Sequence, residues 1–258
     1  MLRRTPLAVL TGTLPLLFAC GGSEPQTQAP PATTTAAAAA PAAAPAGGPT
    51  GSIAGKISFA GTVPPAEKVK VSADAKCAAM HKDGLEKQPV QVKDGGLAHA
   101  FVYLKTGVTG SYPAPTTPAV LDQQGCTYHP HIVGVQVGQP ITIRNSDDTL
   151  HNIHPRPTVN AEFNVGQARK GMEATKTFDK EEVMIPVGCD VHPWMRSYIS
   201  VLNHPFFAVS GDDGTYEIKN VPAGDYEIEV FHEKLKTQTQ KVTVKAGEAA
   251  KVDLSYQG

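Results

Sequence analysis

The sequence predicts an all-β protein built mainly from antiparallel sheets, and three observations support this prediction. Glycine (24 residues) and proline (22 residues) are frequent in the 258-residue chain, whereas aromatic residues make up only 6% of it. From Gly51 onward, short segments of alternating apolar residues are separated by turn sequences. No segment shows the 3.6-residue period of a helix of ordinary length. The length allows one or two domains with a sizeable core, and the formal net charge of -1 gives no electrostatic reason to expect nucleic acid as a partner.

The first fifty residues are predicted to lie outside the folded part. Arg3 and Arg4 precede an apolar run, residues 6–18, that is too short for a permanent membrane span and is typical of a secretory signal. The end of this run, Leu17-Phe18-Ala19-Cys20, resembles a bacterial lipoprotein signal. The resemblance implies removal of residues 1–19, acylation of Cys20, and a place on the periplasmic side of the cell envelope, at the outer membrane where the organism has one. The alternative is an ordinary signal peptide with an incidental Cys20.

The segment that follows is predicted to be a tether. Residues 20–50 consist almost wholly of alanine, proline, threonine, glutamine, serine and glycine, with Glu24 as their one charged side chain. Such a composition buries too little apolar surface to fold, and its prolines keep the chain extended. The lipid anchor would be the chain's only contact with the membrane.

Three cysteines remain once Cys20 is assigned to lipid. An exposed unpaired thiol is a liability in an oxidising compartment, so the third cysteine, which has no partner left for a disulfide, must be accounted for. The simplest assignment is a disulfide between Cys77 and Cys126, with Cys189 kept reduced by a metal. A disulfide between Cys189 and either of the other two is the competing assignment.

Strand patterns then follow one another along the chain, separated by turns rich in glycine and proline. The clearest alternation is in Val133, Val135 and Val137, and again in Ile141 and Ile143. A strong, largely apolar strand is expected over residues 97–104, and the segment 66–96 is polar. The remaining expected strands are 53–59, 162–165, 175–178, 183–186, 198–202, 206–209, 215–218, 226–230, 242–244 and 252–254.

One short loop carries the strongest chemical signal. Cys189, His192 and Met195 stand at the spacing Cys-x2-His-x2-Met and offer a thiolate, an imidazole and a thioether within seven residues. These soft donors suit copper better than magnesium, calcium or manganese. A mononuclear electron-transfer copper site needs two histidines, one cysteine and a weak axial methionine, so one histidine is missing from the loop. The best candidate for it is His151, which Asn152 follows.

These residues, taken in order, resemble the cupredoxin family of blue copper proteins. The resemblance covers residues 119–203 and rests on Tyr128-x-Pro130, Asn145, His151-Asn152 and the Cys189 loop, whose short length is most similar to the amicyanin type. It implies a Greek-key β-sandwich that holds one type 1 copper. His151, Cys189 and His192 would be the strong ligands and Met195 the weak one. Asn152, together with Asn145, would support the ligand loops.

The two flanks resemble the carboxypeptidase regulatory-like, or transthyretin-like, module. Its first strands are similar to residues 51–57 and 97–104, and its later signature is similar to residues 213–226. The resemblance implies a cupredoxin domain (118–203) inserted into, or fused to, a second β-sandwich made of residues 51–117 and 204–258. Insertion at an exposed turn is physically easy. The alternative is that both flanks extend one larger sandwich.

These features predict an exported, membrane-tethered protein that binds one copper and carries single electrons. A redox protein partner is expected to dock over the exposed edge of a ligand histidine. No enzyme activity and no small-molecule substrate are expected, because no second complete ligand set is visible. Two alternatives remain: a metal-free binding or structural module of the envelope, and a copper chaperone or buffer.

Other polar residues have simpler explanations. His129, His131 and His154 are interpreted as surface residues, with a peripheral metal clamp (His129, His131) and a substitute ligand (His154) as the alternatives. His204 and His232 lie beside aromatic residues and are interpreted as hydrogen-bonded interface residues rather than a second site. Trp194 is either an electron-entry surface or part of the core. Loop solvation explains the acidic pair Asp147 and Asp148.

Overall fold

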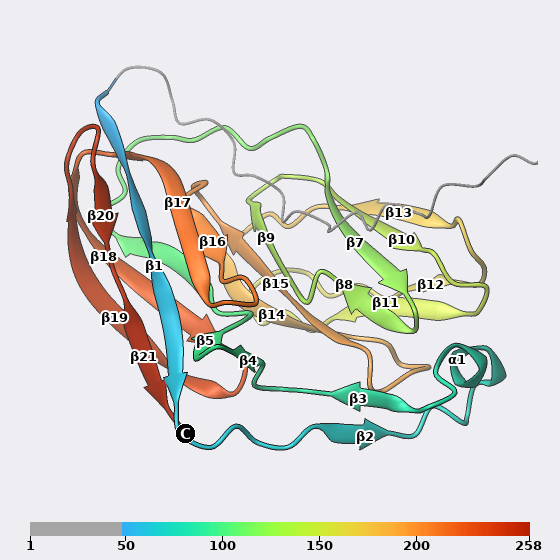
Figure 1. Cartoon of the computed structure of the whole chain (residues 1–258). Coiled ribbons are helices and arrows are strands. Elements are labelled where there is room, and N and C mark those ends of the chain that lie inside the picture. Colours follow the sequence, from blue (N-terminus) through green and yellow to red (C-terminus); the bar gives the residue numbers. More distant parts are fainter. Residues whose placement is uncertain (1–47) are drawn as a thin grey trace, which may run out of the picture. The chain divides into compact units, whose positions relative to one another are not determined.

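The structure, a computed structural model, describes residues 48–258. Within this range the chain forms 21 strands and one six-residue helix, α1 (Ala75–Met80) (Figure 1). The predicted all-β class is therefore confirmed. The predicted signal peptide, the lipidated Cys20 and residues 20–47 of the tether fall outside the described residues.

Two sheets are built from the parts of the chain that flank residues 119–202. The first has the order β17-β1-β5-β4, with β20 and β21 also paired to β1, and the second has the order β16-β6-β18-β19. Apolar residues from both flanks share one buried core, because β1 pairs antiparallel with β17 and parallel with β20 and β21. The strands are β1 (Thr50–Ala60), β4 (Val92–Lys93), β5 (Gly96–Leu97), β6 (Phe101–Thr106), β16 (Phe207–Val209), β17 (Thr215–Pro222), β18 (Gly224–His232), β19 (Leu235–Val244), β20 (Ala249–Lys251) and β21 (Leu254–Gln257).

Two further sheets come from the middle of the chain, with the orders β13-β10-β7-β8 and β12-β11-β14-β15-β9. Alternation decides which side chains enter the core: Ile141 and Ile143 are buried, whereas Arg144 is exposed. A single apolar core runs between these strands. They are β7 (Ala119–Gln124), β8 (Thr127–His129), β9 (Ile132–Gln136), β10 (Ile141–Asn145), β11 (His151–Pro155), β12 (Val165–Gln167), β13 (Glu173–Lys176), β14 (Glu182–Gly188) and β15 (Arg196–Leu202).

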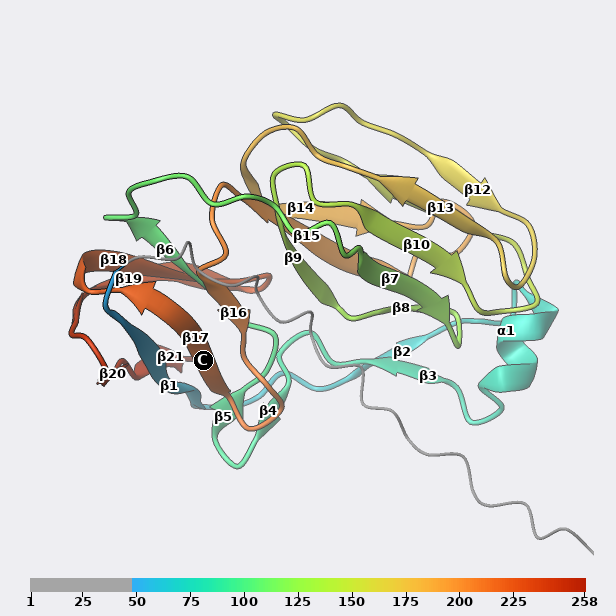
Figure 2. The same ribbon diagram turned by 90° about the horizontal axis from the view of Figure 1, so that it is seen from above.

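A separate segment lies against the middle sheets, as Figures 1 and 2 both show. It consists of β2 (Glu67–Val69), α1 and β3 (Leu85–Lys87), with β2 and β3 paired antiparallel. Val71 and Cys77 of this segment belong to the core of the middle sheets. The predicted boundaries place residues 67–87 with the flanking module, but their apolar side chains belong to the core of the middle sheets, together with Cys126 and Trp194. The domain boundaries otherwise stay a prediction.

The strand expected over residues 97–104 is interrupted. His99 has φ 60°, which lies in the left-handed region and outside the β region, so β5 stops at Leu97 and β6 begins at Phe101. The Ser210 hydroxyl bridges the break by donating to the Leu97 carbonyl (2.7 Å) and accepting from the Ala100 N–H (2.9 Å).

A small third cluster joins aromatic residues of the flanking sheets to the middle sheets. Phe101 and Phe207 pack there with Ile132 and Leu202. Gly134 of β9 makes the close approach achievable, because a Cβ at this position would lie 2.3 Å from the Phe207 ring. The middle and flanking sheets are thus in direct apolar contact through this cluster.

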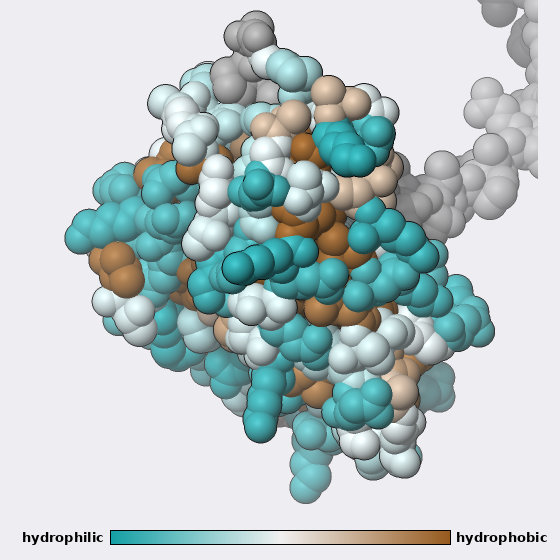
Figure 3. All heavy atoms as spheres, turned by 90° about the vertical axis from the view of Figure 1, so that its left-hand side faces the viewer, coloured by the Kyte–Doolittle hydropathy of each residue, from teal (hydrophilic) through white to brown (hydrophobic). Residues whose placement is uncertain are grey.

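The face of the flanking sheets that contains β19 is mainly hydrophilic, with small hydrophobic areas between polar side chains (Figure 3). This agrees with the exposed polar residues of β19, such as Lys236 and Lys241. Among the described residues, no helix has the length and apolar character needed to cross a membrane.

Candidate metal centre

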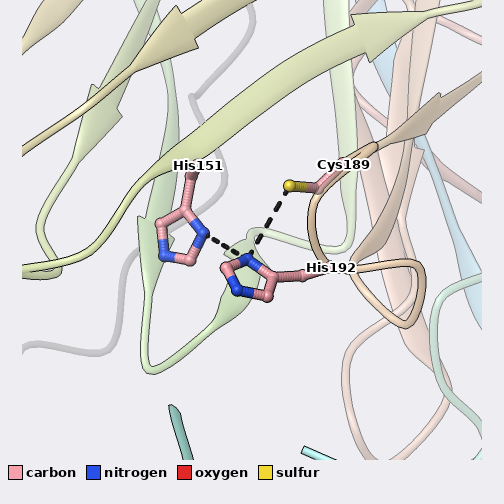
Figure 4. Close-up of side chains that lie close together, drawn as sticks. All are labelled: His151, Cys189 and His192. Atoms are coloured by element: carbon pink, nitrogen blue, oxygen red, sulfur yellow. Dashed lines mark hydrogen bonds between the residues drawn. The ribbon is translucent and has the colours of Figure 1, made fainter. Parts of the chain in front are cut away.

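Two loops at one end of the middle sheets bring the predicted ligands together. His151 is the first residue of β11, Cys189 directly follows β14, and His192 lies in the loop between β14 and β15. Because β11 pairs antiparallel with β14, with His154 opposite Gly188, the start of β11 lies beside the loop that leaves β14. Figure 4 shows the side chains of these three residues turned toward one another.

The donor atoms are close enough for one metal ion. The Nδ1 atoms of His151 and His192 are 2.9 Å apart, and Nδ1 of His192 is 3.9 Å from Sγ of Cys189. Two atoms bound to one ion are separated by no more than the sum of their bond lengths, about 4.1 Å for two imidazoles and about 4.4 Å for imidazole and thiolate at zinc-like distances. Both measured separations meet this limit. The three side chains are buried, with 0% (His151), 3% (Cys189) and 1% (His192) of each residue exposed.

The outer nitrogen of each imidazole faces a carboxylate. Nε2 of His151 lies 3.0 Å from Asp147, and Nε2 of His192 lies 3.2 Å from Asp74. A carboxylate favours an N–H on the nitrogen that faces it, so each ring turns a lone pair inward. Two lone pairs 2.9 Å apart repel each other unless a cation, either a proton or a metal ion, lies between them. The donor set is therefore arranged to hold a cation at its centre.

The ionisation of the cluster agrees with this arrangement. Burial opposes protonation of His151, but hydrogen bonds with Asp147 and Cys189 outweigh burial and raise its pKa to about 9. Burial also disfavours the Cys189 thiolate, yet hydrogen bonds with His151 and with nearby backbone N–H groups lower the pKa of the thiol. Burial lowers the pKa of His192, against the opposing effect of Asp74. The metal-free cluster thus favours a protonated His151 beside a readily ionised Cys189.

Asn152 holds the sulfur of Cys189 in place. Its backbone N–H donates to Sγ (3.5 Å), its side-chain oxygen lies 3.2 Å from Sγ, and the same oxygen accepts from the Asp190 N–H (2.8 Å). Asn145 acts one step further out: its amide donates to the Thr149 carbonyl (2.8 Å), which fixes the loop before His151.

Met195 lies in the same loop and is 1% exposed. Its N–H donates to the His192 carbonyl (2.9 Å), and its carbonyl accepts from the Cys189 N–H (3.4 Å). These two backbone bonds close the loop, so that all three loop ligand candidates lie on one compact turn. Met195 also belongs to the same apolar core as Cys189.

The segment that contains α1 covers the ligand cluster, so the predicted exposed edge of a ligand histidine is absent, with His151 0% and His192 1% exposed. Docking of a redox partner stays a prediction. Asp74, the N-cap of α1, reaches Nε2 of His192, and Sγ of Cys77 lies 3.7 Å from the same nitrogen. Cys77 forms a disulfide with Cys126, and both residues are fully buried. Trp194 closes another side: its ring centroid is 4.9 Å from that of His192, and its indole N–H donates to the Cys126 carbonyl (3.0 Å).

The other histidines lie apart from the cluster. Nδ1 of His154 lies 3.0 Å from Asp190, and its Nε2 contacts Glu162, so both ring nitrogens face carboxylates. His131 pairs with Glu233 (2.8 Å), and His129 is exposed beside Thr127. The two buried histidines bond to the backbone: His204 bonds to the Leu104 carbonyl (2.9 Å), and His232 accepts from the Lys234 N–H (3.2 Å).

Two carboxylates that contact candidate ligands were not predicted from the sequence. Asp147 is 5% exposed and binds His151 as well as the N–H groups of Gly125 and Cys126, so loop solvation is the wrong explanation for it. Asp148, by contrast, is exposed and paired with Lys76 (2.7 Å). A signal for Asp147 was its position four residues before His151. Asp74 had no comparable signal, because it is 118 residues from His192.

The fold and the site define an all-β protein with a buried cluster of two histidines and one cysteine. Residues 197–257 match the family model of the carboxypeptidase regulatory-like domain, which confirms the predicted resemblance of the C-terminal flank. A search of curated proteins gives no match to the chain.

Solved structures similar to part of the chain include amicyanin, a purple cupredoxin and a copper-containing nitrite reductase. A methionine-to-alanine mutant of amicyanin in its Cu(I) form is 24% identical, with 33% of this chain and 81% of that chain covered and a TM-score of 0.30. A purple cupredoxin from Nitrosopumilus maritimus is 22% identical (32% and 98% covered, TM-score 0.28). A copper-containing nitrite reductase from Thermus scotoductus is 20% identical (38% and 25% covered, TM-score 0.30). At these TM-scores the likenesses carry no functional weight, and the chemistry of the site follows from its own side chains.

Proposed function

We propose that the protein binds one copper ion through His151, Cys189 and His192, with Met195 as a weak fourth ligand, and that it carries single electrons. The observation that supports this most strongly is the convergence of two Nδ1 atoms and one thiol sulfur in a buried cluster of side chains. Two imidazoles and a thiolate, with a methionine nearby, are the donors of electron-transfer copper sites. Copper bound there would cycle between Cu(I) and Cu(II).

Burial favours a carrier over an enzyme. Both histidines and the cysteine are at most 3% exposed, so a substrate has no direct access to the ligand atoms. The surrounding residues hold the ligands in one geometry: Asn152 fixes the sulfur, Asp147 fixes His151 and Asp74 fixes His192. A site held in one geometry needs little rearrangement when the charge of its ion changes.

The function is tested by redox cycling of the copper-loaded protein. Stepwise reduction with ascorbate should bleach the visible absorption of the loaded protein, and oxidation with ferricyanide should restore it, with one electron counted per copper. The copper chaperone or buffer alternative predicts instead that reduction releases Cu(I) to a chelator within minutes, without repeated cycling.

Asp74 is expected to position His192. Asp74→Asn keeps a side chain that caps α1 well but removes the carboxylate charge next to Nε2 of His192. Copper affinity should fall by about 10- to 100-fold, the usual effect of losing such an outer partner. The matched control is Asp148→Asn, which removes an exposed carboxylate from the same end of the molecule. Competition with a copper chelator measures both variants, and equal affinities for the two would contradict this role.

The place of the protein in the cell is a separate proposal. The charged start, apolar run and Cys20 support an exported lipoprotein tethered to the envelope, and the composition of residues 20–50 supports a spacer between the membrane and the folded part. The cupredoxin assignment of residues 118–203 and the discontinuous flanking module (51–117 and 204–258, without the segment 67–87 that packs on the middle sheets) are part of the same proposal. An electron carrier also needs a redox protein partner, which is the last part of this proposal.

A further inference from the structure

The disulfide between Cys77 and Cys126 lies directly outside the proposed copper ligands. On one side, Sγ of Cys77 is 3.7 Å from Nε2 of His192, and Asp74 is 3.2 Å from the same nitrogen. The backbone N–H of Cys77 donates to Asp74 (2.9 Å). The buried sulfur, the buried imidazole and the half-buried carboxylate therefore form one group, with ligand atoms within 4.8 Å of one another.

The other half of the disulfide repeats this arrangement. The backbone N–H of Cys126 donates to Asp147 (2.7 Å), and Asp147 lies 3.0 Å from Nε2 of His151. Cys126, Asp147 and His151 again offer ligand atoms within 4.8 Å of one another. Each proposed ligand histidine is thus next to one cysteine and one carboxylate that are not themselves ligands of the proposed copper site. As long as the sulfurs are bonded to each other, neither is a thiolate ligand.

We propose that reduction of the Cys77–Cys126 disulfide creates a second metal site for a thiophilic ion such as Cu(I). The two thiolates are its ligands, because thiolates select Cu(I), and the Nε2–H of His192 and the Asp74 and Asp147 carboxylates line it. In the redox step, a phosphine reductant is oxidised to its phosphine oxide, whose oxygen comes from one water molecule. Its two electrons break the S–S bond, and the two protons of that water molecule complete the two thiols. Binding of Cu(I) then displaces the thiol protons. This second site is not part of the proposed function, because in the oxidised protein the two sulfurs are bonded to each other and cannot act as thiolate ligands.

Copper stoichiometry in the full chain tests this proposal. The metal-free protein is compared before and after anaerobic reduction with a water-soluble phosphine, and mass spectrometry of alkylated peptides counts the free thiols. Cu(I) is supplied from a colorimetric chelator and counted. The oxidised protein should bind one Cu(I) and the reduced protein two. Reduced protein that binds no more Cu(I) than oxidised protein would overturn the proposal.

Variants show where the second ion binds. They also distinguish a failure of this proposal from a failure of the proposed copper site at Cys189. Cys189→Ser should bind no Cu(I) when oxidised and one when reduced, whereas Cys77→Ser/Cys126→Ser should bind one under both conditions. Two ions in the double serine variant would place the second ion elsewhere and overturn the proposal. Failure of the first copper site shows instead as an oxidised wild type that binds none. Fluorescence of Trp194, the sole tryptophan, verifies that each form is folded, and if the double variant unfolds, the wild-type comparison decides alone.

Discussion

Replacing both Cys77 and Cys126 with serine is expected to lower the free energy of unfolding by about 4 kcal/mol. The disulfide joins cysteines 49 residues apart, and a cross-link over such a loop restricts the unfolded chain strongly. It also ties the segment 67–87 to the middle sheets. Apart from the disulfide, a few apolar side chains and hydrogen bonds such as Lys76–Asp148 and Thr149–Asp74 hold that segment in place. A loss of this size is a large part of the 5–15 kcal/mol typical of a folded domain.

Urea unfolding of the metal-free protein measures this loss. Cys189→Ser is the matched control, because Cys189 is a buried cysteine without a disulfide and should cost about 1 kcal/mol or less. A double variant as stable as the control would mean that the cross-link adds nothing to the stability of the fold.

Cys189→Ser is expected to have the largest effect on copper. Serine keeps the shape of the side chain and its bond to Asn152, but its hydroxyl is a hard donor that stays protonated, whereas copper favours a thiolate. Copper affinity should therefore fall by more than the roughly 10- to 100-fold caused by losing an outer partner. The intense thiolate-to-copper absorption should disappear altogether.

His154→Ala is the control for this result, since His154 is on the same strand as His151 but faces Asp190 and Glu162 instead of the cluster. Its visible spectrum and copper affinity should match those of the wild type. If Cys189→Ser keeps the visible band, or if His154→Ala loses it, the assignment of the ligands is wrong.

The centre of the site is predictable from the sequence, because it depends on the spacing of residues that are close together in the chain. Cys189 and His192 lie in one short loop, so their proximity follows from the chain itself. His151 was found because the donor set lacked one histidine, and strand pairing between β11 and β14 then places it beside Cys189. The all-β class was predictable for the same reason, since alternation acts over a few residues.

The cover over the site could not be predicted, because it depends on contacts between distant and mainly polar parts of the chain. Residues 66–96 show no strong strand or helix pattern, yet Asp74 and Cys77 from this segment reach His192 across more than a hundred residues. The role of Asp147 is not predictable from the sequence, because an aspartate in a loop is usually solvated. Its burial depends on the backbone N–H groups of Gly125 and Cys126 in another turn.

Titration of the wild-type, oxidised protein with Cu(II) tests the central claim most directly. One equivalent of copper should bind, with an intense visible thiolate-to-copper band that rises in proportion to bound copper and stops at a ratio of one. A protein that stays colourless and binds no copper would contradict the proposal that His151, Cys189 and His192 form a copper site.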